Sequence, residues 1–165
     1  MQILTEDLSL KNKWFWIDVV YLFIIAATAG AILTLGAFSA PVIFHIKELT
    51  HYQEGVVMAE IFRRFGYWLY FTLFAIILYE GYRFKILKRD NIITATVGVV
   101  IFTTLMFTVV YTPAILQMQA LGEAATQSKE FSNIHKASEI DFQLLLAALV
   151  VLFVRRYYRI THPMR

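Results

Sequence analysis

The chain has 165 residues, of which 59% are hydrophobic and only 16% are charged. An average soluble domain has about 45–50% apolar and about 25% charged residues, so this composition excludes a disordered chain and an ordinary soluble domain. The net charge of +3 comes mainly from basic residues beside apolar stretches, which favours orientation in a membrane over nucleic-acid binding. The chain has no cysteine, which excludes disulfides, cysteine-ligated zinc and iron–sulfur clusters.

Four stretches without a charged residue follow one another along the chain, at 19–44, 65–79, 92–122 and 142–154. A membrane-spanning helix needs about 20 residues to cross roughly 30 Å of hydrocarbon. The first and third stretches are long enough, and the other two reach this length when they include flanking polar residues. We therefore predict a single domain over 1–165 with four spans, near 16–44, 64–83, 92–118 and 136–156.

The connections between these spans are short, and the basic residues are distributed unequally between the two sides. Short connections favour an all-α integral membrane protein folded as an antiparallel four-helix bundle with up-down-up-down topology. Ten Lys and Arg residues flank the side that holds both termini, and five flank the other side. The positive-inside rule therefore places both termini in the cytoplasm. We expect the protein in the cell (inner or plasma) membrane.

Small residues and prolines in the first and third spans predict how the helices pack. Gly30 and Gly36 each lie four residues from an alanine, a spacing that permits close approach of two helices. Pro41 and Pro113 each remove a backbone hydrogen bond and are predicted to kink their helices near the outer leaflet. Such kinks would splay the outer end of the bundle and open a cavity, although a purely structural kink is the alternative.

Histidines mark the outer ends of the first and fourth spans. His45 closes the first span and His135 opens the fourth. In a bundle of alternating helices these two ends lie together, so the two imidazoles are candidate ligands of copper or of a haem. The alternative is that both histidines are ordinary interfacial or hydrogen-bonding residues.

The outer end of the fourth span carries several further polar residues. His135, Ser138 and Glu139 share one helical stripe, and Asp141 lies beside it. A carboxylate at the depth of Asp141 costs a few kcal/mol unless it is paired, protonated or in contact with water. We predict that these side chains converge on an outward-facing polar pocket formed by His45, Tyr111, His135, Ser138, Glu139 and Asp141. The alternative is a fourth span that is simply short, with the polar residues at its end.

Two acidic residues stand near the inner ends of the first and second spans. Asp18 precedes the first apolar stretch and Glu80 follows the second. A charge at this depth needs a partner. We predict that both pair with Arg83 or with the two arginines at 155 and 156.

Short motifs near the span ends resemble one family. They are Gly36-x4-Pro41-x2-Phe44, the loop residues Gly55 and Phe62, Tyr111-Thr112-Pro113, and Phe131-x3-His135-x2-Ser138. This arrangement is similar to the TMEM205-like family, small four-span membrane proteins of unknown function. The resemblance covers roughly residues 15–155 and implies no catalytic role for any residue. The family also has a distant likeness to copper-resistance membrane domains, which implies a role related to a metal.

The chain has no nucleophile elbow, P-loop, dinucleotide fingerprint or HExxH motif, and we expect no enzymatic activity. The resemblance implies a multi-pass membrane protein without an established activity. We expect it to be either an interaction subunit or a protein that handles a small solute or metal at the outward-facing polar pocket. Two alternatives stay open: an ion- or proton-coupled transporter acting as an oligomer, and a redox protein with haem held by His45 and His135. The expected partners are the lipid bilayer and a second copy or another membrane protein, and no nucleic acid.

Overall fold

The computed structural model describes residues 2–86 and 90–162, with side chains from residue 14 onward. This part of the chain is helical and contains no strand. In chain order the elements are α1 (Gln2–Thr34), the π-helix η1 (Leu35–Ser39), α2 (Ala40–Ile43), α3 (His51–Ile86), α4 (Asn91–Leu105), the π-helix η2 (Met106–Tyr111), α5 (Thr112–Ala120), α6 (Glu123–Thr126) and α7 (Lys129–Thr161).

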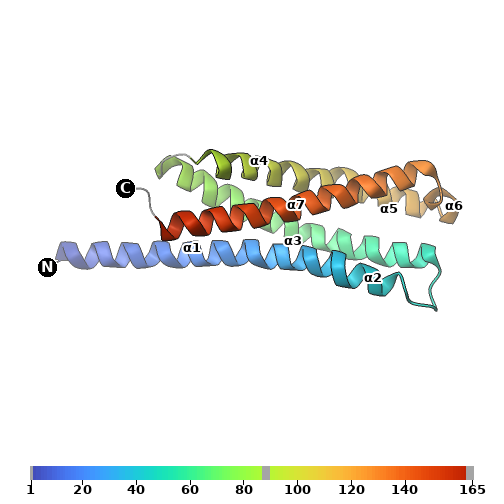
Figure 1. Ribbon diagram of the computed structural model, residues 1–165, viewed down its shortest axis with the longest axis horizontal. Coiled ribbons are helices and arrows are strands. Elements are labelled where there is room, and N and C mark those ends of the chain that lie inside the picture. Colours follow the sequence, from blue (N-terminus) through green and yellow to red (C-terminus); the bar gives the residue numbers. More distant parts are fainter. Residues whose placement is uncertain (1, 87–89, 163–165) are drawn as a thin grey trace.

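These elements form four rods that are long and apolar enough to cross a membrane: Trp14–Ile43, His51–Ile86, Asn91–Ala120 and Lys129–Thr161. The rods run up, down, up and down in one bundle, as the sequence predicts (Figure 1). We call the end that holds both termini and the connection from α3 to α4 the terminal end. The opposite end, with the connections from α2 to α3 and from α5 to α7, is the distal end. The basic residues predict that the terminal end is cytoplasmic.

α1, α3 and α7 begin earlier than the predicted spans, and in α3 and α7 polar residues start the helix. α3 begins at His51 rather than near residue 64. There Thr50 and Gln53 exchange reciprocal hydrogen bonds of 2.9 and 3.3 Å, which form a capping box. α7 begins at Lys129 because the Ser128 hydroxyl accepts from the Phe131 amide at 3.1 Å.

Each proline is the second residue after a π-helical segment. Pro41 stands at the start of α2 after η1, and Pro113 at the start of α5 after η2. A proline within a helix has no amide hydrogen and its ring crowds the carbonyl four residues earlier. The wider π turns relieve this conflict, and the chain bends where α1 gives way to α2 (Figure 1).

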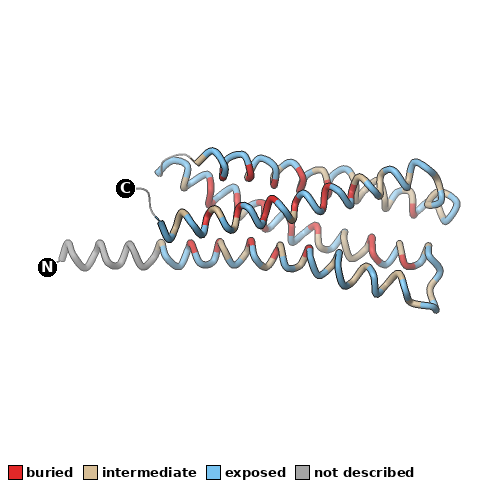
Figure 2. Tube along the Cα trace, viewed as in Figure 1, coloured by how far each residue is buried: buried red, intermediate tan, exposed pale blue. Residues whose placement is uncertain are grey.

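The core lies along the inward face of α7, which packs against α1, α4, η2 and α5 (Figure 2). Buried positions on α7 recur every three or four residues, as in Leu145, Ala148 and Leu152. Towards the distal end, Phe142 stacks on Phe107 with ring centroids 4.8 Å apart. Phe62 makes a T-shaped contact with each of these two rings.

The predicted small-residue contacts do not form within the described residues. A Cβ atom added at Gly30 or Gly36 would meet nothing within 4 Å, because both residues lie on the exposed side of their rod. A closer approach occurs instead at Gly66 of α3, where an added Cβ would lie 3.7 Å from the Thr108 methyl group of η2. Spacing alone identified small residues but not the face that packs.

Candidate functional site

The six residues predicted to form an outer pocket all lie in the distal half of the bundle, but few of them contact one another. His45 is exposed and its Nδ1 lies 2.6 Å from the carbonyl oxygen of Pro41, in its own rod. Tyr111 is half-buried at the end of η2. The partner of His45 is therefore a backbone carbonyl four residues earlier. Among the described residues, no hydrogen bond or ion pair joins His45 to α7.

The four predicted residues on α7 divide into an exposed pair and a buried pair. His135 Nε2 lies 3.3 Å from the Glu139 carboxylate, and both side chains are largely exposed. Ser138 is buried and donates to the carbonyl of His135 at 2.7 Å. Asp141 is buried too, and its Oδ2 has no hydrogen-bond partner in the described part of the chain.

The described residues contain no group of three or more His, Asp or Glu side chains placed to hold a metal ion. The copper or haem site at His45 and His135 stays a prediction. A shallow groove of about 380 Å³ does lie at the splayed distal end, between α2 and α3. None of the six predicted residues lines this groove. Its lining is mostly apolar and consists of Phe38, Ser39, Val42, Ile43 and Ile61.

A denser set of polar side chains lies at the terminal end. We call it the terminal cluster: Asp18 and Tyr21 of α1, Tyr79, Glu80 and Arg83 of α3, Asp90 before α4, and Arg155, Arg156 and Arg159 of α7. Asp18 pairs with Arg83 and Glu80 pairs with Arg156, which confirms the pairing predicted from the sequence. These ion pairs join α3 to α1 and to α7.

Two tyrosines connect the ion pairs to each other. The Tyr79 hydroxyl donates to Asp18 at 2.5 Å, and the Tyr21 hydroxyl donates to Glu80 at 2.6 Å. The two rings stack with centroids 3.7 Å apart, so α1 and α3 exchange one tyrosine–carboxylate bond in each direction. The Arg156 guanidinium lies 5.4 Å from the centre of the Tyr79 ring, at cation–π distance. Aromatic rings and opposite charges thus replace water around these buried groups.

Asp90 caps the start of α4 and also pairs with arginines of α7. Its Oδ1 accepts from the amides of Ile92 and Ile93 at 3.1 and 3.3 Å, which caps the helix. Its Oδ2 lies 3.0 Å from Arg155 and 3.3 Å from Arg159, on the last turns of α7. Burial acts to raise the pKa of Asp90, but the hydrogen bonds from Arg155 and the two amides outweigh burial and hold that pKa below its ordinary value.

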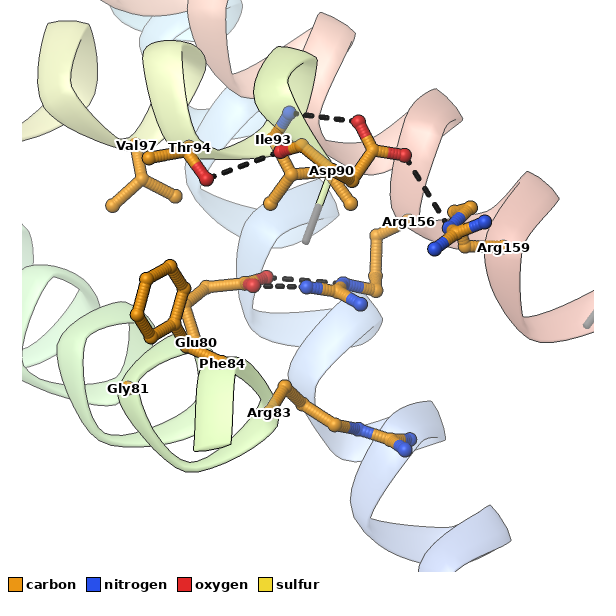
Figure 3. A pocket seen from close by; sticks show the side chains of 10 residues that line it. All are labelled: Glu80, Gly81, Arg83, Phe84, Asp90, Ile93, Thr94, Val97, Arg156 and Arg159. Carbon is orange, nitrogen blue, oxygen red and sulfur yellow. Dashed lines mark hydrogen bonds and ion pairs between the residues drawn. The ribbon is translucent and has the colours of Figure 1, made fainter. Parts of the chain in front are cut away.

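A cavity of about 270 Å³ opens between α3, α4 and α7 within the terminal cluster. Figure 3 shows Glu80 and Arg156 joined across one side of the cavity, and Asp90 reaching Arg159 on another. The rest of the lining is largely apolar and includes Phe84, Ile93 and Val97. The cavity therefore combines a charged rim with an apolar wall.

Residues 23–124 of the chain match the protein family described as Domain of unknown function (DUF4149). The chain belongs to the DUF4149 family. No match was found among curated proteins or among solved structures. This DUF4149 protein is thus a multi-pass membrane protein, and the family description supplies no activity for it.

Sequence reasoning identified the charged members of two ion pairs in this DUF4149 protein but missed the cavity, both tyrosines and the role of Asp90. Some signals were available. Tyr21 lies one helical turn after Asp18, and Tyr79 precedes Glu80. Asp90 has the residue type and position of a helix cap, directly before an apolar stretch. The cavity had no such signal, because three elements distant in sequence enclose it.

Proposed function

We propose that this protein is a non-enzymatic membrane protein of the TMEM205-like type that binds an anionic amphiphile at its terminal end. The ligand has one anionic headgroup and an apolar chain, as in an anionic phospholipid or a fatty-acid-like solute. The positive-inside rule places this site in the cytoplasmic leaflet. Binding, rather than catalysis, is proposed because the cluster's carboxylates are engaged by arginines or tyrosines.

The cavity of the terminal cluster is the observation that carries this proposal. The cluster contains four arginines and three carboxylates, and the Asp90 carboxylate pairs with both Arg155 and Arg159. The guanidinium groups of Arg83, Arg156 and Arg159 at the cavity rim favour an anionic headgroup. The apolar wall of Phe84, Ile93 and Val97 suits the first part of an acyl chain.

Binding can be measured by native mass spectrometry of the detergent-solubilised protein. Phosphatidylglycerol, phosphatidylcholine, a medium-chain fatty acid and inorganic phosphate are each added at equal concentration. We expect several-fold more bound phosphatidylglycerol than phosphatidylcholine. Retention of the fatty acid would indicate that any anionic amphiphile is accepted, and retention of phosphate alone would show that the headgroup suffices.

The matched variants are Arg159→Gln and Arg63→Gln. Arg159 lines the cavity, whereas Arg63 is exposed in the distal half and pairs with Glu60. We expect Arg159→Gln to reduce phosphatidylglycerol binding to near the phosphatidylcholine level, and Arg63→Gln to leave it unchanged. Equal binding of the two lipids, or equal effects of the two variants, would refute the proposal.

A second candidate is a proton-coupled transporter acting as an oligomer, and it is favoured by one observation, the buried carboxyl group of Asp141. Four spans are few for a carrier, so two copies would have to supply the pathway. The test is acidification of the lumen of proteoliposomes under a pH gradient. Proton uptake into the vesicles that is lost with Asp141→Asn supports this function. Proton uptake equal to that of vesicles without protein excludes it.

A further inference from the structure

Asp141 is a buried carboxyl group within a membrane-spanning helix. Only 6% of the residue is exposed, and its Oδ2 is buried with no hydrogen-bond partner in the described part of the chain. Buried polar atoms in folded proteins are almost always satisfied. An unsatisfied carboxylate oxygen therefore requires a proton, an ion or a water molecule.

The position of Asp141 along α7 places it inside the hydrocarbon layer. From Arg156 of the terminal cluster to Asp141 the helix rises about 22 Å, at 1.5 Å per residue. The hydrocarbon layer is roughly 30 Å thick, so a bilayer with one edge at the terminal cluster encloses Asp141 below its other edge. The ionised form is strongly disfavoured there, whereas the neutral acid is tolerated.

In the described part of the chain no ion pair joins Asp141 to a cation, and an aromatic cluster begins at the next residue of α7. The next residue, Phe142, packs against Phe107 of η2 and Phe62 of α3. Among the described side chains, α4 and α5 carry no titratable residue, and the nearby cations of α3 pair with Glu60 in exposed ion pairs. The other titratable side chains on elements that contact α7 are Asp18 and Tyr21 of α1, Tyr111 of η2, Glu123 of α6 and, on α3, His51, Tyr52, Glu54, Tyr67, Tyr70, Tyr79, Glu80, Tyr82, Arg83 and Lys85. α7 itself adds Lys129, Glu130 and Lys136 towards its distal end, and Arg155, Arg156, Tyr157, Tyr158 and Arg159 at its terminal end.

A line of polar groups on α7 leads from the distal surface to Asp141. His135 and Glu139 form an ion pair with side chains that are 44% and 58% exposed. Ser138 is buried, one turn from Asp141, and donates to the carbonyl of His135. Exposure thus falls from the His135–Glu139 pair through Ser138 to Asp141.

We propose that Asp141 is a proton-binding site in the membrane interior, loaded from the distal side along Ser138 and the His135–Glu139 pair. The proton satisfies the orphaned oxygen and removes the charge from the hydrocarbon layer. The ligand of this site is a proton, and the site is separate from the cavity of the terminal cluster. This proposal and the binding of an anionic amphiphile at the terminal cluster can therefore fail independently, whereas the proton-coupled transporter also depends on Asp141.

The apolar reagent dicyclohexylcarbodiimide tests this site, because it reacts with protonated carboxyl groups in apolar surroundings. The acid proton moves to a reagent nitrogen, the carboxyl oxygen bonds to the central carbon, and the adduct rearranges to a stable N-acylurea. We expect peptide mass spectrometry to find the adduct on Asp141 at mildly acidic pH and to find less of it as the pH is raised. A water-soluble carbodiimide should label Glu139 in preference to Asp141.

Three variants complete the test. Asp141→Asn should remove the adduct, Asp141→Glu should retain it, and Glu139→Gln, which alters an exposed carboxylate, should retain it. Infrared spectroscopy of the folded protein should show the carbonyl band of a protonated carboxyl that is missing in Asp141→Asn. An adduct that persists in Asp141→Asn, or the absence of both the adduct and the band, would overturn the proposal.

Discussion

Removing one partner of the ion pair between Glu80 and Arg156 should strongly destabilise the bundle. Their side chains are only 9% and 7% exposed, so water cannot replace a lost partner. Arg156→Met removes both guanidinium contacts to the carboxylate and leaves the Tyr21 hydroxyl as its remaining donor. Breaking a buried ion pair in this way costs about 3–5 kcal/mol, because an uncompensated charge stays buried.

The double variant Glu80→Gln with Arg156→Met should recover most of this loss. The glutamine is neutral and can still accept from Tyr21, so no buried charge is left without a partner. The difference between the double variant and the sum of the single variants then measures the coupling of the two residues. We expect a coupling of several kcal/mol in favour of the pair, because each single variant leaves a buried charge unpaired and the double variant leaves none.

Unfolding in mixed micelles with increasing denaturing detergent, followed by tryptophan fluorescence, provides the free energies. Arg155→Gln is the matched control, since Arg155 is the adjacent arginine and its side chain is 35% exposed in an ion pair with Asp90. This control should lose less than about 1 kcal/mol. Equal losses for Arg156→Met and Arg155→Gln would refute the conclusion that burial makes the Glu80 pair indispensable.

Two further predictions concern acid stability and orientation. Because the pKa of Asp90 is lower in the folded protein than its ordinary value near 4, its contribution to stability is complete above about pH 4 and is lost as the pH falls through the lower folded pKa. Asp90→Asn should therefore make thermal stability less dependent on pH in the acid range, and an unchanged slope would contradict this. The chain has no cysteine, so a single cysteine in place of exposed Asn133 should react with an impermeant thiol reagent from outside the cell. A cysteine at Lys88, which lies outside the described residues, should not react, and the opposite result would reverse the predicted orientation.

The amino-acid sequence by itself determined that this protein has four membrane-spanning helices in an all-helical bundle. That information is local, because a span depends only on the length of an apolar stretch and on the charges beside it. The sequence also indicated that Asp18 and Glu80 need arginine partners, since an unpaired charge at their depth is disfavoured whatever the fold. The starts of α3 and α7 were missed, although the capping residues Thr50 and Ser128 were visible in the sequence.

Only the tertiary structure decided which face of each helix packs and which residues meet across the bundle. Gly30 and Gly36 have the spacing of a helix contact but lie in open surroundings, because rotation of a helix about its axis is set by all of its neighbours together. In the same way Asp141 is turned into the bundle while Glu139, two residues earlier, is turned out. The cavity of the terminal cluster depends on the joint positions of α3, α4 and α7, which no stretch of sequence specifies alone. A helix in a membrane is defined by its own residues, and a site between helices is defined by their packing.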